Sequence, residues 1–584
     1  MKSLVVSLGL LAASITAVPG LAAPKTSPLN PPKNEMPGEG PFSKPEKEPP
    51  PADAGAESPQ ALDLDRLVGE IALLRAKSGP FPKSPPPAQW RLEDVRARAA
   101  EGEELLYAGR IDEAIAHLMA VVEHPRFDAF AEDDAGRAAV YLLGDAFATA
   151  GAYVPARAYL GRVLKTRGAW NDRGTYARRA VKRWVEMAIE SQRFESFLED
   201  LRDVPPRAPE ETRGEIFYLT GRAKEAAGDP SAALAAYAQV TQRSRFWAQA
   251  TYLQGLIQVE RGRFKEGENL FCKVADPARQ SNTTPVFADA HYFAVRDLAR
   301  LGLGRIAHEQ FRFDDSRYYY YLVPRDSDRL AEALYEGATG RYEKKDYEGA
   351  RELLDELKAL RVHHRYEDEA WILDAYVDLA RCKFPDADRK LVTFVRRYEP
   401  VRDAARRAMT DERAMQSLLA AARSGADARG GVPTAGAADR AIESTRTIAM
   451  LLRIDPAYGV ASRERAVLNR ETSGLRMDPA LSGRVDTARR ELGQTETRLA
   501  KDSLARLDLR LSRLLRRARL ARIESVLGRK RALEVEIEAI QSGILPAGAL
   551  DSLDAARYLK DNEEYWPFEG DDWPDEFVGS EGAR

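Results

Sequence analysis

The chain has 584 residues, more than one compact domain of about 100–200 residues holds, so several domains or an extended repeat array is expected. Apolar residues make up 44% and charged residues 31%, which excludes a wholly disordered chain. A net charge of −3 excludes a globally basic nucleic-acid binder, and two cysteines, Cys272 and Cys382, exclude a disulfide scaffold or a Cys-rich zinc module.

The N-terminus has the pattern of a cleavable secretory signal. Lys2 precedes an apolar run that ends at Pro19, and a small-residue cleavage motif follows from Gly20 to Ala22. We therefore predict a signal peptide over 1–22 and an exported chain, periplasmic or envelope-associated. An uncleaved membrane anchor is the alternative, but the run is short for a span of roughly 20 residues, and no later stretch is apolar enough to cross a membrane.

Two short segments separate this signal from the main body of the chain. Residues 23–60 are rich in proline and polar residues, which predicts a disordered linker. Residues 61–77 place Leu64, Leu67, Val68, Ile71 and Leu74 on one helical face. This pattern predicts a short amphipathic helix, which we expect to dock on a neighbour or to self-associate because a lone short helix is only marginally stable.

Residues 91–423 repeat a pattern of small residues that predicts antiparallel helix pairs. A small residue in a first helix is followed 12 positions later by a small residue in a second helix, where the two helices can approach closely. The pairs are Gly102/Ala114, Gly144/Ala156, Gly221/Ala233, Gly255/Gly267, Gly304/Ser316, Ala338/Ala350 and Ala375/Ala387, and Val185/Phe197 keeps only the spacing. Large apolar residues four positions later, such as Leu118, Leu160 and Tyr237, are expected to fill the gap to the next repeat, and 401–423 to form a capping helix.

This register resembles that of the tetratricopeptide-repeat (TPR) family, over about eight helix pairs. Trp371 is similar to the tryptophan of the family's first helix in one repeat, and the family's inter-repeat proline is mostly absent. The resemblance implies an all-α fold, a right-handed α-solenoid whose first helices line a concave groove for peptides or partner proteins.

The candidate groove residues lie near the small residue of each first helix. They are Tyr141, Tyr218, Arg222, Tyr252, Arg305, Tyr335, Tyr342 and Tyr376. A ladder of tyrosines and arginines suits an extended peptide, because it offers flat amphipathic contact area and donors for carboxylates and carbonyls. In the alternative interpretation, the tyrosines pack between adjacent helices.

The sequence contains no recognisable catalytic, cofactor or metal motif. HExxH, GxxxxGK[ST] and GxSxG are absent, and His363-His364 with the acidic residues that follow fits no known ligand spacing. We therefore predict a protein that is not an enzyme, with no cofactor and no metal. A bond between Cys272 and Cys382 is not expected, because their repeats are too far apart.

Residues 440–545 are predicted to form a helical, coiled-coil-like region. Its seam consists of Leu504, Leu507, Leu511, Leu514, Ala518 and Ala521, and Ile523, Val526, Leu533, Ile537 and Ile540 resume the pattern in a shifted phase. Three interpretations stay open: a homo-oligomer through 484–545, folding back on the helix expected at 440–455, or a partner protein. Twelve basic and three acidic residues between Arg498 and Arg531 suit an acidic partner or anionic lipid, and nucleic acid is not expected for an exported chain.

The tail, 546–584, contains an acidic and aromatic segment. Residues 561–578 carry eight acidic residues and no basic one, together with Trp566, Phe568 and Trp573 as predicted anchors. We expect this segment to dock on the chain's own basic helix, with a second protein as the alternative. The tail is similar to the endings of TPR proteins in bacterial gliding-motility machinery.

These observations predict an exported, non-enzymatic scaffold that binds proteins or peptides, with envelope proteins as its partners. The resemblance places it in an envelope-spanning assembly such as a gliding-motility complex. Two alternatives remain: an accessory or regulatory factor for a cell-wall or outer-membrane assembly enzyme, and a structural coiled-coil oligomer with the repeats as spacers.

Overall fold

A computed structural model describes residues 58–79, 90–166, 168–170, 175–201, 208–276, 289–360, 366–424 and 437–541, with the single residues 204, 206 and 364. The predicted signal peptide, most of the linker and the tail anchors Trp566, Phe568 and Trp573 lie outside these residues. Beyond the first 46 residues, the chain divides into two compact units. Unit 1 comprises Lys47–Arg296 and Ile454–Leu499, and unit 2 comprises Asp297–Arg453 and Ala500–Arg584.

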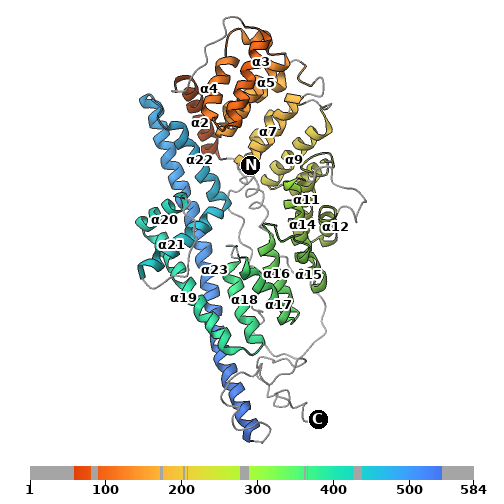
Figure 1. The fold of residues 1–584 in the computed structure, drawn as a ribbon, viewed down its shortest axis with the longest axis vertical. Helices are drawn as coiled ribbons and strands as arrows, with labels where there is room; N and C mark the ends of the chain where they lie inside the picture. The colour runs from red at the N-terminus through yellow and green to blue at the C-terminus, as the bar shows by residue number, and fades with distance from the viewer. Residues whose placement is uncertain are drawn as a thin grey trace. The chain divides into compact units, whose positions relative to one another are not determined.

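The described residues are helical and contain no β-strand, which confirms the predicted all-α fold of stacked helix pairs (Figure 1). The pairs within unit 1 are α3 (Leu92–Tyr107) with α4 (Ile111–Val122), α5 (Asp134–Ala150) with α6 (Tyr153–Lys165), α7 (Thr175–Ser191) with α8 (Phe194–Asp200), α9 (Glu210–Ala226) with α10 (Pro230–Tyr237), and α11 (Trp247–Glu260) with α12 (Phe264–Ala275). The later pairs are α14 (Ala290–Glu309) with α15 (Phe313–Tyr321), α16 (Leu330–Glu343) with α17 (Tyr347–Ala359), and α18 (Glu367–Ala380) with α19 (Phe384–Thr410). A single 3₁₀ turn, η1 (Phe127–Phe130), precedes α5.

Every pair turns at a residue with left-handed backbone. These residues are Gly109, Gly151, Gln192, Gly228, Gly262, Phe311, Lys345 and Cys382, with φ between 58° and 81°. Each lies five positions before the second residue of a predicted pair, and the register includes the weakest pair, Val185/Phe197, through Gln192. The eight helix pairs therefore share one backbone geometry, even where the small residues are lost.

The glycines of the first helices accommodate a large side chain of their own pair. A Cβ added to Gly102, Gly144 or Gly221 would lie 2.2–2.8 Å from Leu118, Leu160 or Tyr237, respectively. Each of these large residues therefore packs on the glycine sixteen residues before it, within its own pair. The small pair Gly255/Gly267 does meet at its crossing, where a Cβ on Gly267 would lie 3.2 Å from the Gly255 carbonyl oxygen.

The second helix of the last pair is longer than predicted. Helix α19 continues through Pro400 to Thr410, and α20 (Glu412–Ser424) follows as a separate helix. The predicted single capping helix over 401–423 is therefore wrong. Pro400 lies inside α19, where it removes one backbone hydrogen bond, yet it does not end the helix.

In unit 1, the segments that precede and follow the repeats in the sequence pack beside the first three pairs. Helix α2 (Pro59–Ser78) contacts α4, α6 and α22 (Pro456–Thr472). Leu468 of α22 and Leu481, Val485 and Leu492 of the following helix are buried in the same hydrophobic core as the repeats. The amphipathic segment at 61–77 therefore docks on the repeats, one of the two outcomes expected for it.

One buried arginine holds these segments together by charge. Arg193, at the start of α8, donates at 2.6 Å to Asp65 of α2 and at 2.6 Å to Glu464 of α22. Its side chain is buried, and burial raises the pKa of Asp65 to about 6 and raises the pKa of Glu464. The three residues form an ion cluster among three helices that are far apart in the sequence.

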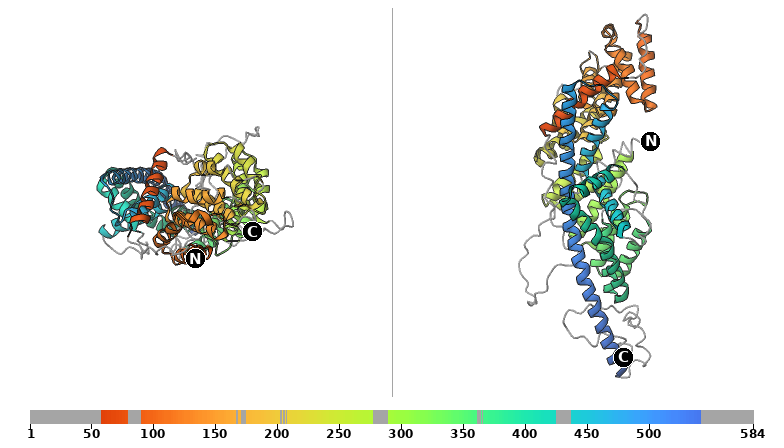
Figure 2. Two further views of the ribbon diagram at one scale, coloured as in Figure 1. Left: turned by 90° about the horizontal axis from the view of Figure 1, so that it is seen from above. Right: turned by 90° about the vertical axis from the view of Figure 1, so that its left-hand side faces the viewer.

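The longest helix among the described residues is α23 (Pro479–Gln541), whose residues up to Leu499 belong to unit 1 and whose later residues belong to unit 2 (Figure 2). In unit 2 it runs antiparallel to α19: Arg406 pairs with Asp508, Glu399 with Arg519, and Ser525 donates to the carbonyl of Phe384. Leu504, Leu511, Leu514, Ala518 and Ala521 of the predicted seam are buried there. The seam therefore folds back on the chain's own last repeat, which gives no support to a homo-oligomer through 484–545.

The predicted continuation of that seam is wrong at three of its five residues, whereas Leu533 is half-buried and the side chain of Ile540 lies outside what the structure describes. Ile523, Val526 and Ile537 are exposed, whereas Ser525 and Ala532 continue the buried face in the original phase. The register therefore does not shift at Ile523. The exposed apolar residues belong to a second face of α23.

No helix among the described residues has the length and apolar character that crossing a membrane requires. Cys272 is half-buried and Cys382 is buried.

Candidate protein-interaction surfaces

Three of the predicted groove tyrosines are buried between helices. Tyr218 stacks on Phe246 with ring centroids 4.2 Å apart, and Tyr252 contacts Phe271 with centroids 5.2 Å apart. Tyr335 donates to Glu369 at 2.9 Å. Their place in the structure agrees with the alternative interpretation, in which the tyrosines pack between adjacent helices.

The two predicted groove arginines already have partners. Arg222 is buried, lies 4.9 Å above the ring of Phe194 and 3.5 Å from Glu225. Arg305 pairs with Glu332 at 2.7 Å and with Glu336 at 2.6 Å. Both guanidinium groups therefore serve contacts within their own unit.

The remaining three tyrosines are half-buried. Tyr141 of α5 lies beside Tyr176 of α7, with ring centroids 5.9 Å apart. In unit 2, burial and the neighbouring Glu524 of α23 raise the pKa of Tyr376 to about 12. Burial also raises the pKa of Tyr342, and the charge of Glu524 adds to this increase. Glu524 of α23 therefore acts electrostatically on the first-helix tyrosines of the last two pairs.

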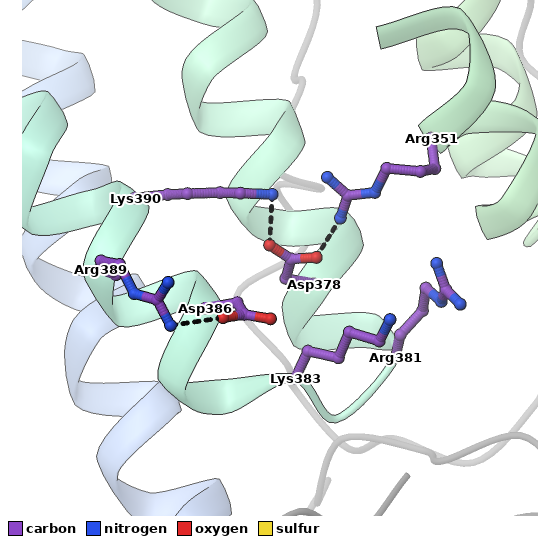
Figure 3. A pocket seen from close by; sticks show the side chains of 7 residues that line it. All are labelled: Arg351, Asp378, Arg381, Lys383, Asp386, Arg389 and Lys390. Atoms are coloured by element: carbon purple, nitrogen blue, oxygen red, sulfur yellow. Dashed lines mark hydrogen bonds and ion pairs between the residues drawn. The ribbon is translucent and has the colours of Figure 1, made fainter. Parts of the chain in front are cut away.

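A basic hollow of about 310 Å³ lies at the turn of the last pair (Figure 3). Seven side chains line it: Arg351, Asp378, Arg381, Lys383, Asp386, Arg389 and Lys390. They come from α17, the end of α18, the turn at Cys382 and the first turns of α19. Five are basic and two acidic, so the lining side chains carry a formal charge of +3, which the adjacent Asp374 and Glu348 reduce to +1.

Two carboxylates neutralise the inner cations of this hollow. Asp378 pairs with Arg351 and, at 2.5 Å, with Lys390. Asp374, one turn earlier on α18, pairs with Lys390 at 3.0 Å, with Lys358 at 2.9 Å and with Arg351. Burial acts to raise the pKa of Asp374, but these cations outweigh it and lower the pKa below its usual value. The carboxylate therefore stays charged, and α17, α18 and α19 are held together by this network.

The remaining three cations of the hollow form at most one ion pair each with described residues. Arg389 pairs only with Asp386 among the described residues, at 2.7 Å, and both are largely exposed, so the pair is worth little. Arg381 pairs with Glu348. The ammonium of Lys383 has no ion-pair partner within the described part of the chain. Lys383 also precedes α19, whose N-terminal amides add positive potential.

The hollow was not predicted from the sequence. The signal that marks it is the run Arg381-Cys-Lys383 at the turn, followed by Arg389 and Lys390 on the first turns of the next helix. A left-handed residue at position 382 brings both ends of this run to one side of the turn. Recognising it requires the turn position, which the sequence shows only once the repeat register is known.

Comparisons with known proteins do not identify this chain. No family model matches it, and no curated protein matches. Among solved structures, the TPR domain of P58(IPK) is 14% identical with a TM-score of 0.18 and covers 69% of this chain and 99% of that chain. A circular tandem repeat protein with novel repeat topology is 15% identical with a TM-score of 0.14 and covers 81% and 98%. Such low TM-scores do not establish a common fold, so the helix-pair assignment rests on the chain's own turn geometry.

Proposed function

We propose that the protein is a non-enzymatic scaffold that binds an acidic segment of a partner protein in the basic hollow of α17, α18 and α19. The observation that carries this proposal is the excess of cations in the lining of the hollow, where Lys383 forms no ion pair with a described residue. Arginine and lysine clusters are a common means of recognising acidic motifs, because each carboxylate gains a charge-assisted hydrogen bond. The volume suits a few side chains rather than a folded domain.

Binding of a defined acidic probe to the full-length chain tests this proposal. Fluorescein-labelled hexaglutamate should bind with an affinity that falls at least tenfold in Lys383→Glu, since the substitution changes two units of charge inside the hollow. Arg263→Glu is a matched control, because Arg263 has the same place before α12 in the fifth pair. Melting temperatures of both variants should equal that of the wild type.

The proposal fails if hexaglutamate binds the wild type and Lys383→Glu equally well while both are folded. Binding that falls by the same factor in the Arg263→Glu control also contradicts a specific site. It would indicate general attraction to cationic surface.

We further propose that the scaffold works outside the cytoplasm, in an envelope assembly such as a gliding-motility complex. The support is the sequence pattern at 1–22 and the acidic, aromatic tail. Mass spectrometry of the chain recovered from a periplasmic fraction should show the loss of 1–22. A chain that keeps these residues and remains in the cytoplasm contradicts this part of the proposal.

The second candidate function is an accessory factor for a cell-wall or outer-membrane assembly enzyme. The same basic hollow favours it, because an acidic loop of such an enzyme is one form of acidic segment. Activation of a purified cell-wall hydrolase by the wild type, and not by Lys383→Glu, would distinguish this role from passive anchoring.

A further inference from the structure

The two faces of α23 within unit 2 have opposite environments. The face toward the last repeat buries Leu511, Ala518 and Ser525. On the opposite face, Leu509, Leu520, Ile523 and Leu527 are 69%, 53%, 57% and 60% exposed. A period of 3.6 residues per turn aligns these four side chains in one row, which we call the outer stripe.

The outer stripe is amphipathic. Arg516 lies in the same row, between Leu509 and Leu520, and is exposed, with no ion-pair partner in the part of the chain that the structure describes. By contrast, Arg519 and Arg522 pair with Glu399 and Asp388 of α19. A row of large aliphatic side chains in water is unusual for a soluble surface and marks a contact site. Arg516 within the row adds a preference for an acidic occupant.

We propose that the outer stripe of α23 docks the acidic and aromatic segment 561–578 of the same chain. That segment carries eight acidic residues, no basic residue and five aromatic residues. Its aromatic rings supply apolar area for the leucines and isoleucine of the stripe, and its carboxylates supply a partner for Arg516. The charge and the apolar content of the two segments are therefore complementary.

The connecting chain is long enough for this contact. Nineteen residues, 542–560, separate the end of α23 from the acidic segment. Extended, they reach about 60 Å, whereas at 1.5 Å per residue Leu509 lies about 48 Å from Gln541 and Leu527 about 21 Å. A short tether also gives the tail an effective concentration near the millimolar range. The tail thus has an advantage over an acidic lipid surface or a second copy.

Site-specific photo-crosslinking in the purified full-length chain tests the proposal. p-Benzoylphenylalanine in place of Ile523 should form crosslinks to peptides from 561–578. The same group in place of the exposed Tyr321 of α15 is the control and should not reach the tail. Mixing isotopically labelled and unlabelled chains separates crosslinks within one chain from crosslinks between copies.

Tail variants define the chemistry of the contact. The double substitution Trp566→Ser with Trp573→Ser should lower the crosslink yield at position 523 at least tenfold without changing the melting temperature. An excess of a synthetic 561–578 peptide should compete, and the same peptide with both tryptophans replaced by serine should not. Crosslinks only between copies, crosslinks only to added anionic vesicles, or no crosslink to 561–578 would each overturn the proposal.

Discussion

The left-handed residue in each turn is a local source of strain in four helix pairs. Gln192, Phe311, Lys345 and Cys382 have positive φ without being glycine, although glycine adopts this backbone at no steric cost. Lys345, with φ of 66°, is exposed, so replacing it disturbs little packing. We expect Lys345→Gly to raise the free energy of unfolding by about 0.5 to 1 kcal/mol, the left-handed penalty less the added entropy of the unfolded chain.

Chemical denaturation of Lys345→Gly and Lys345→Ala measures this effect. Alanine removes the lysine side chain but keeps the Cβ, so it should show no gain. If both substitutions change stability equally, the cause is the side chain and not the backbone.

At the glycines that contact a large side chain, substitution by alanine is expected to lower stability. A Cβ on Gly221 would lie 2.2 Å from the ring of Tyr237, which is fully buried and cannot move aside. Gly221→Ala should therefore lower the free energy of unfolding by about 1 to 3 kcal/mol, as overpacking does. Gly483 of α23 is also helical but has no atom within 4 Å of an added Cβ. Gly483→Ala should stabilise by about 0.5 to 1 kcal/mol, and thermal melts of the two variants should shift in opposite directions.

At the scale of the element, the ion cluster on Arg193 makes the docking of α2 and α22 depend on pH. The pKa of Asp65 is about 6 in the folded chain against 3.8 in an unfolded one, mainly because of burial. Between these values the folded chain binds more protons than the unfolded chain, so stability falls as pH rises from about 4 to about 6. Across this range the free energy of unfolding of the wild type should fall by on the order of 2 kcal/mol, and Asp65→Asn should abolish this fall.

Unfolding curves at several pH values check this expectation. Asp63→Asn is the matched control, because Asp63 is on the same helix and forms an exposed pair with Arg66. An unchanged pH profile in Asp65→Asn would show that this carboxyl does not titrate as its burial suggests.

The docking of α23 on the last repeat depends on a second buried carboxyl. Asp368, at the start of α18, is buried and pairs with Arg510 of α23. Burial raises the pKa of Asp368 despite this pair. Arg510→Met leaves the carboxyl without its cation and should destabilise unit 2 by on the order of 3 kcal/mol.

Arg516→Met is the matched control on the opposite face of the same helix and should change stability little. The double variant Arg510→Met with Asp368→Asn should recover part of the loss. Equal effects of Arg510→Met and Arg516→Met on the melting temperature would contradict the pairing.

The sequence predicts helices and their pairing where the pattern depends on residues close together in the chain. The 12-residue spacing of small residues follows from the contact of two adjacent helices, so the pairs were predictable even where Val185/Phe197 lacks small residues. The packing partner of Leu118 or Tyr237 was not predictable, because a large side chain four residues beyond the crossing can face either its own glycine or the next repeat. The predicted shift of the buried face of α23 after Ala521 was wrong for a similar reason. Ile523 and Val526 have seam-like spacing, but the buried face continues through Ser525 and Ala532.

The candidate site depends even more on three-dimensional context. Tyrosine and arginine at groove positions were predicted to bind a peptide, yet Tyr218 and Arg222 are buried by neighbouring helices. Composition alone does not separate an aromatic that faces a ligand from one that faces the next helix. The basic hollow joins Arg351 to Lys383 and Lys390, three positions on separate elements, and only the turn at Cys382 brings them together.

For the molecule as a whole, the basic hollow and the outer stripe are two cationic surfaces with different apolar content. The hollow is lined only by charged side chains, whereas the outer stripe has four exposed aliphatic ones. Salt screens exposed charges, with a Debye length that shortens from about 10 Å at 0.1 M to about 3 Å at 1 M, but it does not weaken apolar burial. Over this range, hexaglutamate binding to the full-length chain should fall at least tenfold and come to resemble that of Lys383→Glu. The crosslink from position 523 to the tail should change less than twofold. A parallel loss of both signals would mean that the tail, too, is held by charge alone.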